Sequence, residues 1–198
     1  MSIQTEIEVK FIRINLDDIR QRLTQAGATL EQPMRSMRRV ISDTVNHDQW
    51  EFLRVRDEGD KITLTFKKFD SSKELSIDSA QEIEVQVSDF QKTIDLLSAT
   101  GLEFRSFQES KRETWQLGEV EIVLDVWPWL DPYMEIEGST EAQLKEVAEK
   151  LGLDWQHAVF GDVMAAYRAQ YPHLKLNETV GDLASVRFGD PLPDFLKP

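Results

Sequence analysis

Several segments of the chain alternate charged and apolar residues, and their charged members are the types that bind metal ions and phosphates. The first is Glu6-Ile7-Glu8-Val9-Lys10-Phe11, and Glu135-Ile136-Glu137 repeats its acidic pattern. Arg54-Val55-Arg56 and Thr63-Leu64-Thr65-Phe66-Lys67 alternate in the same way with basic residues. Carboxylates suit hard divalent cations, whereas arginine and lysine suit phosphate oxygens. If these segments share one enclosed surface, that surface binds metal ions and a polyanion.

The distribution of charge over these segments indicates which way their charged faces point. Strict alternation is typical of a β-strand with one apolar and one polar face, and a sheet with one face in solvent would alternate as well. Here, however, whole strands are acidic or basic, and like charges at i and i+2 repel unless something bridges them. The acidic pairs are Glu6/Glu8, Glu82/Glu84 and Glu135/Glu137. We therefore expect a charged interior and an apolar exterior packed under helices.

Turn residues and periodicity divide the rest of the chain into eight strands and four helices. The strands are expected near residues 3–14, 36–45, 50–57, 61–69, 80–87, 103–116, 119–126 and 133–138. The first helix is expected to run to Ala26 from a cap at Asn15 or Asp17, and the others between Ser88 and Gly101, at 139–150 and at 158–171. Eight mostly antiparallel strands can close and so remove exposed edges. The predicted fold class is α+β, a closed eight-stranded antiparallel β-barrel with a charged lumen and a helical cover, over residues 1–172, with a tail at 173–198 packed on or near it.

Composition excludes several classes of protein. The 198 residues include no cysteine, which excludes disulfides and thiolate metal sites and favours a cytoplasmic location. The formal net charge of −13 argues against nucleic-acid binding through a general basic field, although a local basic pocket for phosphates is compatible with it. No apolar run is long enough for a membrane helix, so we expect neither a membrane nor a nucleic-acid partner.

The ordered set of charged segments resembles the CYTH superfamily, the triphosphate tunnel metalloenzymes. Glu6-Ile7-Glu8-Val9-Lys10 matches the N-terminal signature of that family, and the resemblance extends from residue 3 to about 170. The further matches, in order, are Leu53-Arg54-Val55-Arg56, Leu64-Thr65-Phe66-Lys67, Glu82-Ile83-Glu84, Lys111-Arg112-Glu113-Thr114-Trp115, Leu124-Asp125 and Glu135-Ile136-Glu137. The family fold is a closed eight-stranded tunnel, in agreement with the strand count.

The resemblance also implies roles for individual residues. Mg²⁺ or Mn²⁺ would be held by carboxylates from Glu6, Glu8, Glu82, Glu84, Asp125, Glu135 and Glu137. Triphosphate would be bound by Lys10, Arg39, Arg54, Arg56, Lys67 and Arg112. The catalytic residues would be Glu8, Glu84 and Lys10. Ser110 stands where many members carry a lysine. Either Arg39 would supply that charge or, if a bulge turns it from the other face, the neighbouring Lys111 would do so.

Three functions remain open at this point. The first is a metal-dependent triphosphatase acting on inorganic triphosphate, a nucleoside triphosphate or another organic triphosphate, as a monomer or homodimer. The second is an adenylyl cyclase, which uses the same metal cage to form cyclic AMP and pyrophosphate from ATP. The third is a module that binds polyphosphate or nucleotide without turnover.

Overall fold

The computed structural model describes residues 4–46, 51–69 and 80–197, without the side chains of 4–6 and 80. The strands in this part of the chain are β1 Gln4–Glu6, β2 Glu8–Phe11, β3 Thr29–Asp43, β4 Glu51–Asp57, β5 Ile62–Phe69, β6 Ala80–Val87, β7 Phe104–Leu117, β8 Val120–Val126, β9 Tyr133–Glu137 and β10 Ser185–Val186. The α-helices are α1 Leu16–Ala26, α2 Phe90–Ala99, α3 Glu141–Lys150 and α4 Val163–Gln170. Short 3₁₀ turns lie at Trp155–His157, Val180–Asp182 and Asp194–Leu196.

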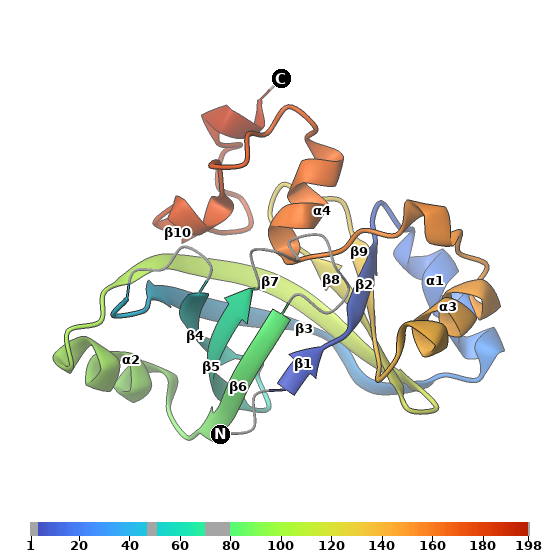
Figure 1. Ribbon diagram of the computed structural model, residues 1–198, viewed down its shortest axis with the longest axis horizontal. Coiled ribbons are helices and arrows are strands. Elements are labelled where there is room, and N and C mark those ends of the chain that lie inside the picture. The colour runs from blue at the N-terminus through green and yellow to red at the C-terminus, as the bar shows by residue number, and fades with distance from the viewer. Residues whose placement is uncertain (1–3, 47–50, 70–79, 198) are drawn as a thin grey trace.

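All the strands belong to one curled sheet, in which neighbours are antiparallel apart from β10 (Figure 1). Its order is β1-β6-β5-β4-β3-β7-β8-β9-β2, and β10 pairs with β7 off this path. The two ends of the path, β1 and β2, are consecutive pieces of chain separated only by Ile7. The α+β class and the antiparallel sheet are therefore confirmed, and the closure of the sheet into a barrel stays a prediction.

The outer face of the sheet is apolar and is covered by helices. Beneath α1 and α3, buried residues of β2, β8 and β9 form one core with the helix residues Leu23 and Leu144. Beneath α2, Val40 of β3 and Val55 of β4 pack on Phe90. Because helices cover the apolar face of these strands, their opposite, charged face is turned toward the inside of the curl.

The ends of α1 follow from local chemistry. The Asn15 side chain accepts hydrogen bonds from the backbone N–H groups of Asp17 and Asp18, both at 3.0 Å, and so satisfies two donors of the first turn. Gly27 ends the helix at φ +83°, a left-handed conformation that favours glycine. The predicted helix ending at Ala26 is confirmed, and its cap is Asn15 rather than Asp17.

Three predicted boundaries are wrong. The strand predicted over 3–14 is interrupted at Ile7 and ends at Phe11, where its pairing with β9 ends. The last helix does not span 158–171 but begins at Val163, because Gly161 has φ +107° and Asp162 accepts a hydrogen bond from the N–H of Met164 at 2.9 Å, as an N-cap does. The strand expected from residue 36 begins at Thr29. Its first part shifts register twice against β7, around Gln32, and this irregularity accommodates Pro33 in a strand.

The tail after α4 packs on the end of the sheet that carries Trp127 and Tyr133. Val180, Val186 and Leu196 are buried in one cluster with those two aromatic residues. β10 runs parallel to β7 at Phe107 and Gln108, which lie beyond the part of β7 that β8 covers. In Figure 1 this segment, in orange and red, lies over one side of the curled sheet.

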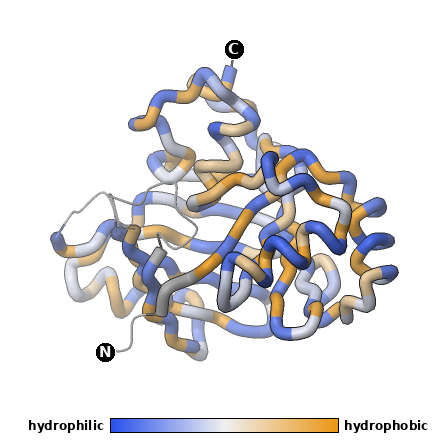
Figure 2. The backbone as a smooth tube through the Cα atoms, turned by 45° about the vertical axis from the view of Figure 1, so that its right-hand side comes forward, coloured by the Kyte–Doolittle hydropathy of each residue, from blue (hydrophilic) through white to orange (hydrophobic). Residues whose placement is uncertain are grey.

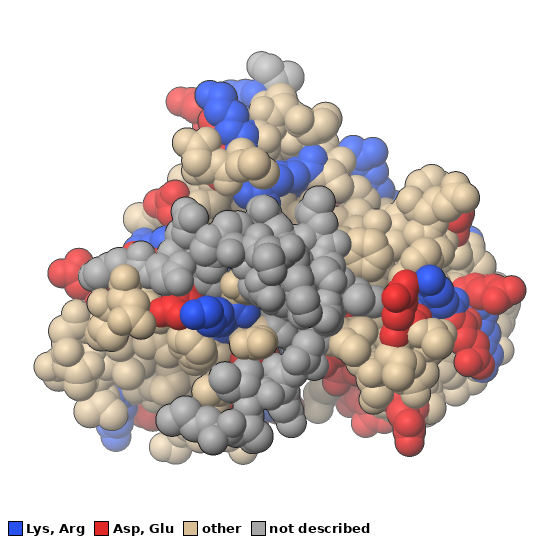
Figure 3. Space-filling model, in the orientation of Figure 1, with Lys and Arg blue, Asp and Glu red and all other residues tan. Residues whose placement is uncertain are grey.

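The described helices include none that is long and apolar enough to cross a membrane. Figure 2 shows hydrophilic and hydrophobic residues interspersed along the described chain. Acidic side chains gather on the surface around α1 and α3, on the right of Figure 3. On this side of the molecule the acidic excess lies on the outer surface.

Candidate active site

Strand register brings the predicted charged residues onto one face of the sheet. Residues directly opposite one another in neighbouring strands project to the same side. The pairs include Lys10 with Glu135, Arg112 with Asp125, Arg39 with Arg56, Lys67 with Glu82 and Thr65 with Glu84. Several of these polar side chains are buried although no apolar core surrounds them, with Lys10 and Asp125 each 1% exposed. This part of the charged face is therefore shielded from solvent, whereas Glu84 of β6 is exposed.

The acidic side of this interior is built around Lys10. Its ammonium contacts carboxylate oxygens of Glu8 at 2.6 Å and Glu135 at 3.2 Å, and it donates a hydrogen bond to the carbonyl of Gly161 at 2.6 Å. Burial lowers the pKa of Lys10, but the two carboxylates outweigh it and raise the pKa above its ordinary value. Two carboxylates thus converge on one cationic centre.

Glu135 links this centre to a second ion pair. Arg112 donates to both oxygens of Asp125, at 2.7 and 2.5 Å, and to Glu135 at 3.0 Å. Burial raises the pKa of Glu135, but the charges of Lys10 and Arg112 outweigh it and lower the pKa to about 2. Glu135 therefore carries its negative charge at neutral pH.

The basic side consists of three neighbouring arginines. Arg39 donates to Gln108 at 2.8 Å, and its guanidinium lies 4.3 Å from the centre of the Trp127 ring. Burial and the charges of Arg54 and Arg56 lower the pKa of Arg39 to about 9. Like charges held this close are unfavourable without a counter-ion, so the cluster favours binding of an anion.

Strand β6 carries carboxylates that face these cations. Glu84 accepts a hydrogen bond from the hydroxyl of Thr65 at 2.8 Å and lies 3.7 Å from Arg54 and 3.9 Å from Arg56. Glu82 lies 3.5 Å from Lys67. The longer of these contacts are attractive at a distance but are not hydrogen bonds.

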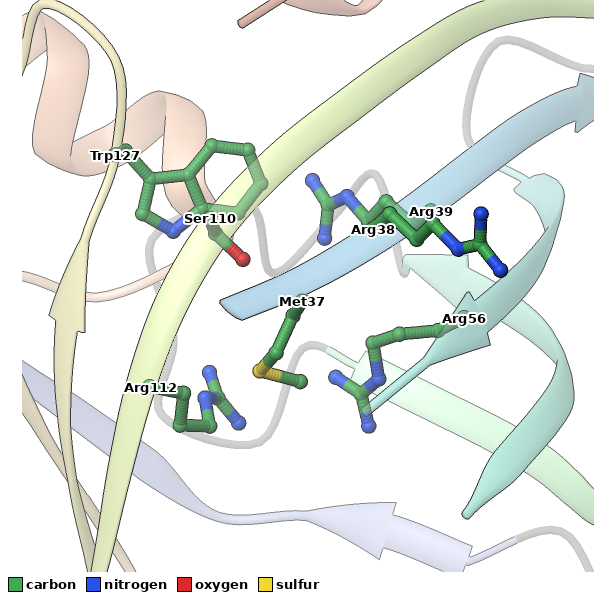
Figure 4. Close-up of a pocket in the computed structure, with 7 residues that line it drawn as sticks. All are labelled: Met37, Arg38, Arg39, Arg56, Ser110, Arg112 and Trp127. Atoms are coloured by element: carbon green, nitrogen blue, oxygen red, sulfur yellow. The ribbon is translucent and has the colours of Figure 1, made fainter. Parts of the chain in front are cut away.

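Two cavities that share Arg56 and Arg112 as lining residues lie on the charged face. The inner one, shown in Figure 4, has room for about one water molecule, about 10 Å³. Arg56 and Arg112 point toward each other across it, with Met37 between them. A larger cavity of about 340 Å³ adjoins Arg56 and Arg112 on their other side. Its remaining lining residues are Glu31, Gln32, Arg35, Glu58, Asp60, Lys61, Thr114, Gln116 and Glu121.

A family profile for the CYTH domain matches residues 4–157, which is most of the chain. The chain belongs to the CYTH family. The resemblance seen in the charged segments is thereby confirmed. No match was found among curated proteins.

Solved structures share the CYTH fold with this chain. A protein of Pyrococcus horikoshii is 24% identical, with a TM-score of 0.64, over 77% of this chain and 93% of its own. A candidate adenylate cyclase from Vibrio parahaemolyticus is 16% identical, with a TM-score of 0.68, over 82% and 97%. A candidate adenylyl cyclase from Hippeastrum, described as having a dominant triphosphatase activity, is 14% identical, with a TM-score of 0.53, over 83% and 96%. At these identities the likeness shows the fold alone.

The CYTH domain brings some predicted site residues together and separates others. Glu8, Lys10, Asp125, Glu135 and Arg112 form one connected ion network. Glu137 is exposed at the end of β9, and the side chain of Glu6 lies outside the described residues. Among the side chains that the structure describes, no three carboxylates or histidines gather closely enough to hold one metal ion.

Lys111 and Arg39 lie on the faces of the sheet that the alternation of their strands predicts. Lys111 is exposed and lies against Phe188 of the tail, with its ammonium 5.2 Å from the ring centre, so it does not replace the charge absent at Ser110. Arg39 lies inside, beside Ser110 in the inner cavity. Both positions follow from the alternation of their strands.

Sequence reasoning missed four residues of the interior. Arg35 and Met37 precede Arg39 at two-residue spacing, which would have revealed them had the strand been started earlier. Glu58 lies in a turn, where no periodicity indicates a direction. Tyr133 is buried beside Asp125, directly opposite it in β8 and β9, and no sequence signal distinguished it from an ordinary core tyrosine.

Proposed function

We propose that this CYTH domain is a divalent-metal-dependent triphosphatase whose curled sheet closes into a tunnel through the continuous segment that forms β1 and β2. The observation that carries the proposal is the charged face on which the arginine cluster Arg39, Arg54 and Arg56 stands opposite paired carboxylates. A triphosphate carries enough negative charge to satisfy the cluster, and arginine forks suit phosphate oxygens. Lys67 and Arg112 add charge along the same face.

The carboxylates around Lys10 would supply two protein ligands to a hard divalent cation, since the described side chains bring no three such groups together. Oxygens of Glu8 and Glu135 already converge on one positive centre, and carboxylates are the ligands that Mg²⁺ and Mn²⁺ prefer, with phosphate oxygens and water completing the shell. Asp125, which shares Arg112 with Glu135, would extend this set. When bound, such an ion supplies charge neutralisation at the phosphate oxygens.

The chain's own residues then bind the substrate and direct the attack. Arg54, Arg56 and Lys67 hold the phosphate chain in line, and burial excludes bulk water from it. Glu84 lies among these cations, oriented by Thr65, and orients a water molecule toward the terminal phosphorus atom. The water oxygen forms the new bond to phosphorus, the bridging P–O bond breaks, and the bridging oxygen leaves with the remaining phosphates. Lys10 holds Glu8 and Glu135 in position for the metal.

The cyclase is the second candidate, because one structural neighbour is described as a candidate adenylate cyclase. It requires a pocket for adenine at the mouth of the tunnel. Among the residues that the structure describes, those lining the 340 Å³ cavity are polar or charged and include no aromatic ring on which a base could stack. The lining therefore favours hydrolysis over cyclisation.

One product analysis tests the proposal. The purified chain is incubated with Mg²⁺ or Mn²⁺ and with inorganic triphosphate or ATP, and the products are separated. We expect orthophosphate, with loss of turnover in Arg56→Gln and in metal chelator. Cyclic AMP with pyrophosphate would support the cyclase instead, and binding without any product would support the third candidate, a non-catalytic module.

A further inference from the structure

Glu58 is a buried carboxylate at the mouth of the charged face. It lies in the turn between β4 and β5 and is 3% exposed. Its backbone N–H donates to the carbonyl of Lys61 at 2.9 Å, and Gly59 follows it with φ +91°. Turn carboxylates usually point to solvent. Here the turn directs the side chain inward, to the lining of the 340 Å³ cavity.

Cations surround this carboxylate. Its oxygens lie 2.6 Å from Arg56, 3.3 Å from Arg35 and 4.0 Å from Lys61. Burial raises the pKa of Glu58, but Arg56, Lys61, Arg112 and Arg35 outweigh it, so the pKa is lowered and the group is ionised. The same cations would face any anion that reached the cavity from the inner site, because Arg56 and Arg112 line both spaces.

The contact between Glu58 and Arg56 leaves both groups with unused bonding capacity. The 2.6 Å approach lacks hydrogen-bond geometry, and the buried Oε1 of Glu58 has no hydrogen-bond partner within the described part of the chain. The same is true of Nε of Arg56. Arg56 can therefore turn toward a phosphate without breaking a directional bond to Glu58.

We infer that Glu58 is a specificity-determining residue, an internal anion that competes with the outer phosphate of the substrate for Arg56, Arg35 and Lys61. The inference rests on the proposed function, because it assumes a phosphate chain in the tunnel. Glu58 weakens binding of anions that extend into the cavity more than binding of shorter ones. It thereby limits how long a phosphate chain the tunnel accepts. If Glu58 only supported the fold, neutralising it would weaken triphosphate binding instead of strengthening it, because an unpaired arginine would destabilise the site.

The test compares binding in solution without turnover. Inorganic triphosphate and pyrophosphate are titrated calorimetrically into the full chain in EDTA at fixed salt. Glu58→Gln should bind triphosphate about tenfold more tightly than the original chain, because a unit charge within a few ångströms of the ligand is removed. The gain for pyrophosphate should be about twofold, since the shorter anion does not reach the cavity. Glu149→Gln, which removes the same charge from an exposed position on α3, should change both by less than twofold.

The results that overturn the inference are equally specific. Equal or weaker triphosphate binding by a folded Glu58→Gln chain overturns it, as does an equal gain for both anions. If that variant does not fold, Glu58→Asp is used instead, because it withdraws the carboxylate from Arg56 while keeping its charge. Triphosphate binding by Glu58→Asp that is no tighter than binding by the original chain overturns the inference. If the original chain hydrolyses triphosphate but Glu58→Gln binds it no more tightly, the inference is rejected and the proposed function stands. Failure of every chain to bind triphosphate rejects the proposed function with it.

Discussion

Glu135 is the residue on which the charged interior depends most directly, because two buried cations share its carboxylate. Lys10 approaches it from β2 and Arg112 from β7, so one side chain ties three strands together. A carboxylate held in this way is ionised, oriented and shielded from water. These are the properties that a metal ligand facing a phosphate chain requires.

Replacing Glu135 by glutamine should abolish the proposed turnover. The amide keeps the shape of the side chain but removes the negative charge that a divalent cation and Lys10 need, so we expect phosphate release to fall by about 100-fold or more. The measurement is orthophosphate release from inorganic triphosphate at saturating Mg²⁺. Glu146→Gln, an exposed change on α3, is the matched control. Wild-type turnover in Glu135→Gln would remove Glu135 from the site.

The lowered pKa of Glu135 also predicts how stability depends on pH. Its folded value is about 2 against an ordinary 4.5, so the carboxylate contributes stability above pH 4.5 and loses that contribution as the pH falls toward 2. The loss should amount to about 3 kcal/mol of unfolding free energy. Denaturant unfolding of the metal-free chain across this range measures it. Glu135→Gln should show a shallower decline than the original chain, and parallel curves would contradict the assignment.

The positions of site residues could be predicted within strands, where side chains alternate between the two faces, but not in turns. Alternation placed Lys10, Arg54 and Arg112 on one face, and the structure agrees because neighbouring strands keep that register. Glu58 belongs to a turn whose direction depends on tertiary contacts with Arg35 and Arg56, which no local pattern encodes. The contact of Lys10 with Glu135 likewise depends on the meeting of β2 and β9, which are far apart in the sequence.

At the scale of elements, the strands and helices were predictable because apolar periodicity and capping residues agree locally. The β4–β5 hairpin and α1 begin and end close to the residues that their turn and cap signals indicate. The irregular start of β3 was not predictable, because Pro33 argues locally against a strand while pairing with β7 overrides it. Helix α4 is shorter than its apolar pattern suggests because Gly161 and Asp162 set its start.

The cap of α1 gives a prediction at this scale. Asn15→Ala removes the acceptor for the N–H groups of Asp17 and Asp18 and should lower the free energy of unfolding by about 1 kcal/mol. Asn15→Ser keeps a capping oxygen and should lose less. Phosphate release should be unchanged in both, because α1 packs on the outer face of the sheet. A stability equal to that of the original chain, measured by urea unfolding of Asn15→Ala, would show that the cap is not formed.

At the scale of the whole molecule, the segment beyond the family match takes part in the interior. The profile ends at residue 157, yet the carbonyl of Gly161 accepts the hydrogen bond from Lys10, and Val159 pairs with the backbone of Lys10 through two hydrogen bonds of 2.9 Å. Farther along, the hydroxyl of Tyr167 donates to the carbonyl of Pro128 at 2.6 Å. The chain after the matched region therefore supports the same end of the sheet that carries Arg39 and Trp127.

The tail should consequently unfold together with the sheet rather than separately. Leu196 is fully buried in the cluster around Trp127, and Leu196→Ala should cost about 3 kcal/mol through lost burial and a cavity. In a chain of this size that lowers Tm by roughly 8 °C. Leu176→Ala, at a leucine that is 77% exposed, is the matched control and should leave Tm within about 1 °C. Calorimetry should show one transition that moves as a unit in Leu196→Ala, because the tail and the sheet share this core. If a second transition appeared and only that transition shifted, the tail would fold independently. Its unfolding would then remove the support of the Arg39 end of the tunnel without unfolding the strands that carry Lys10 and Glu135.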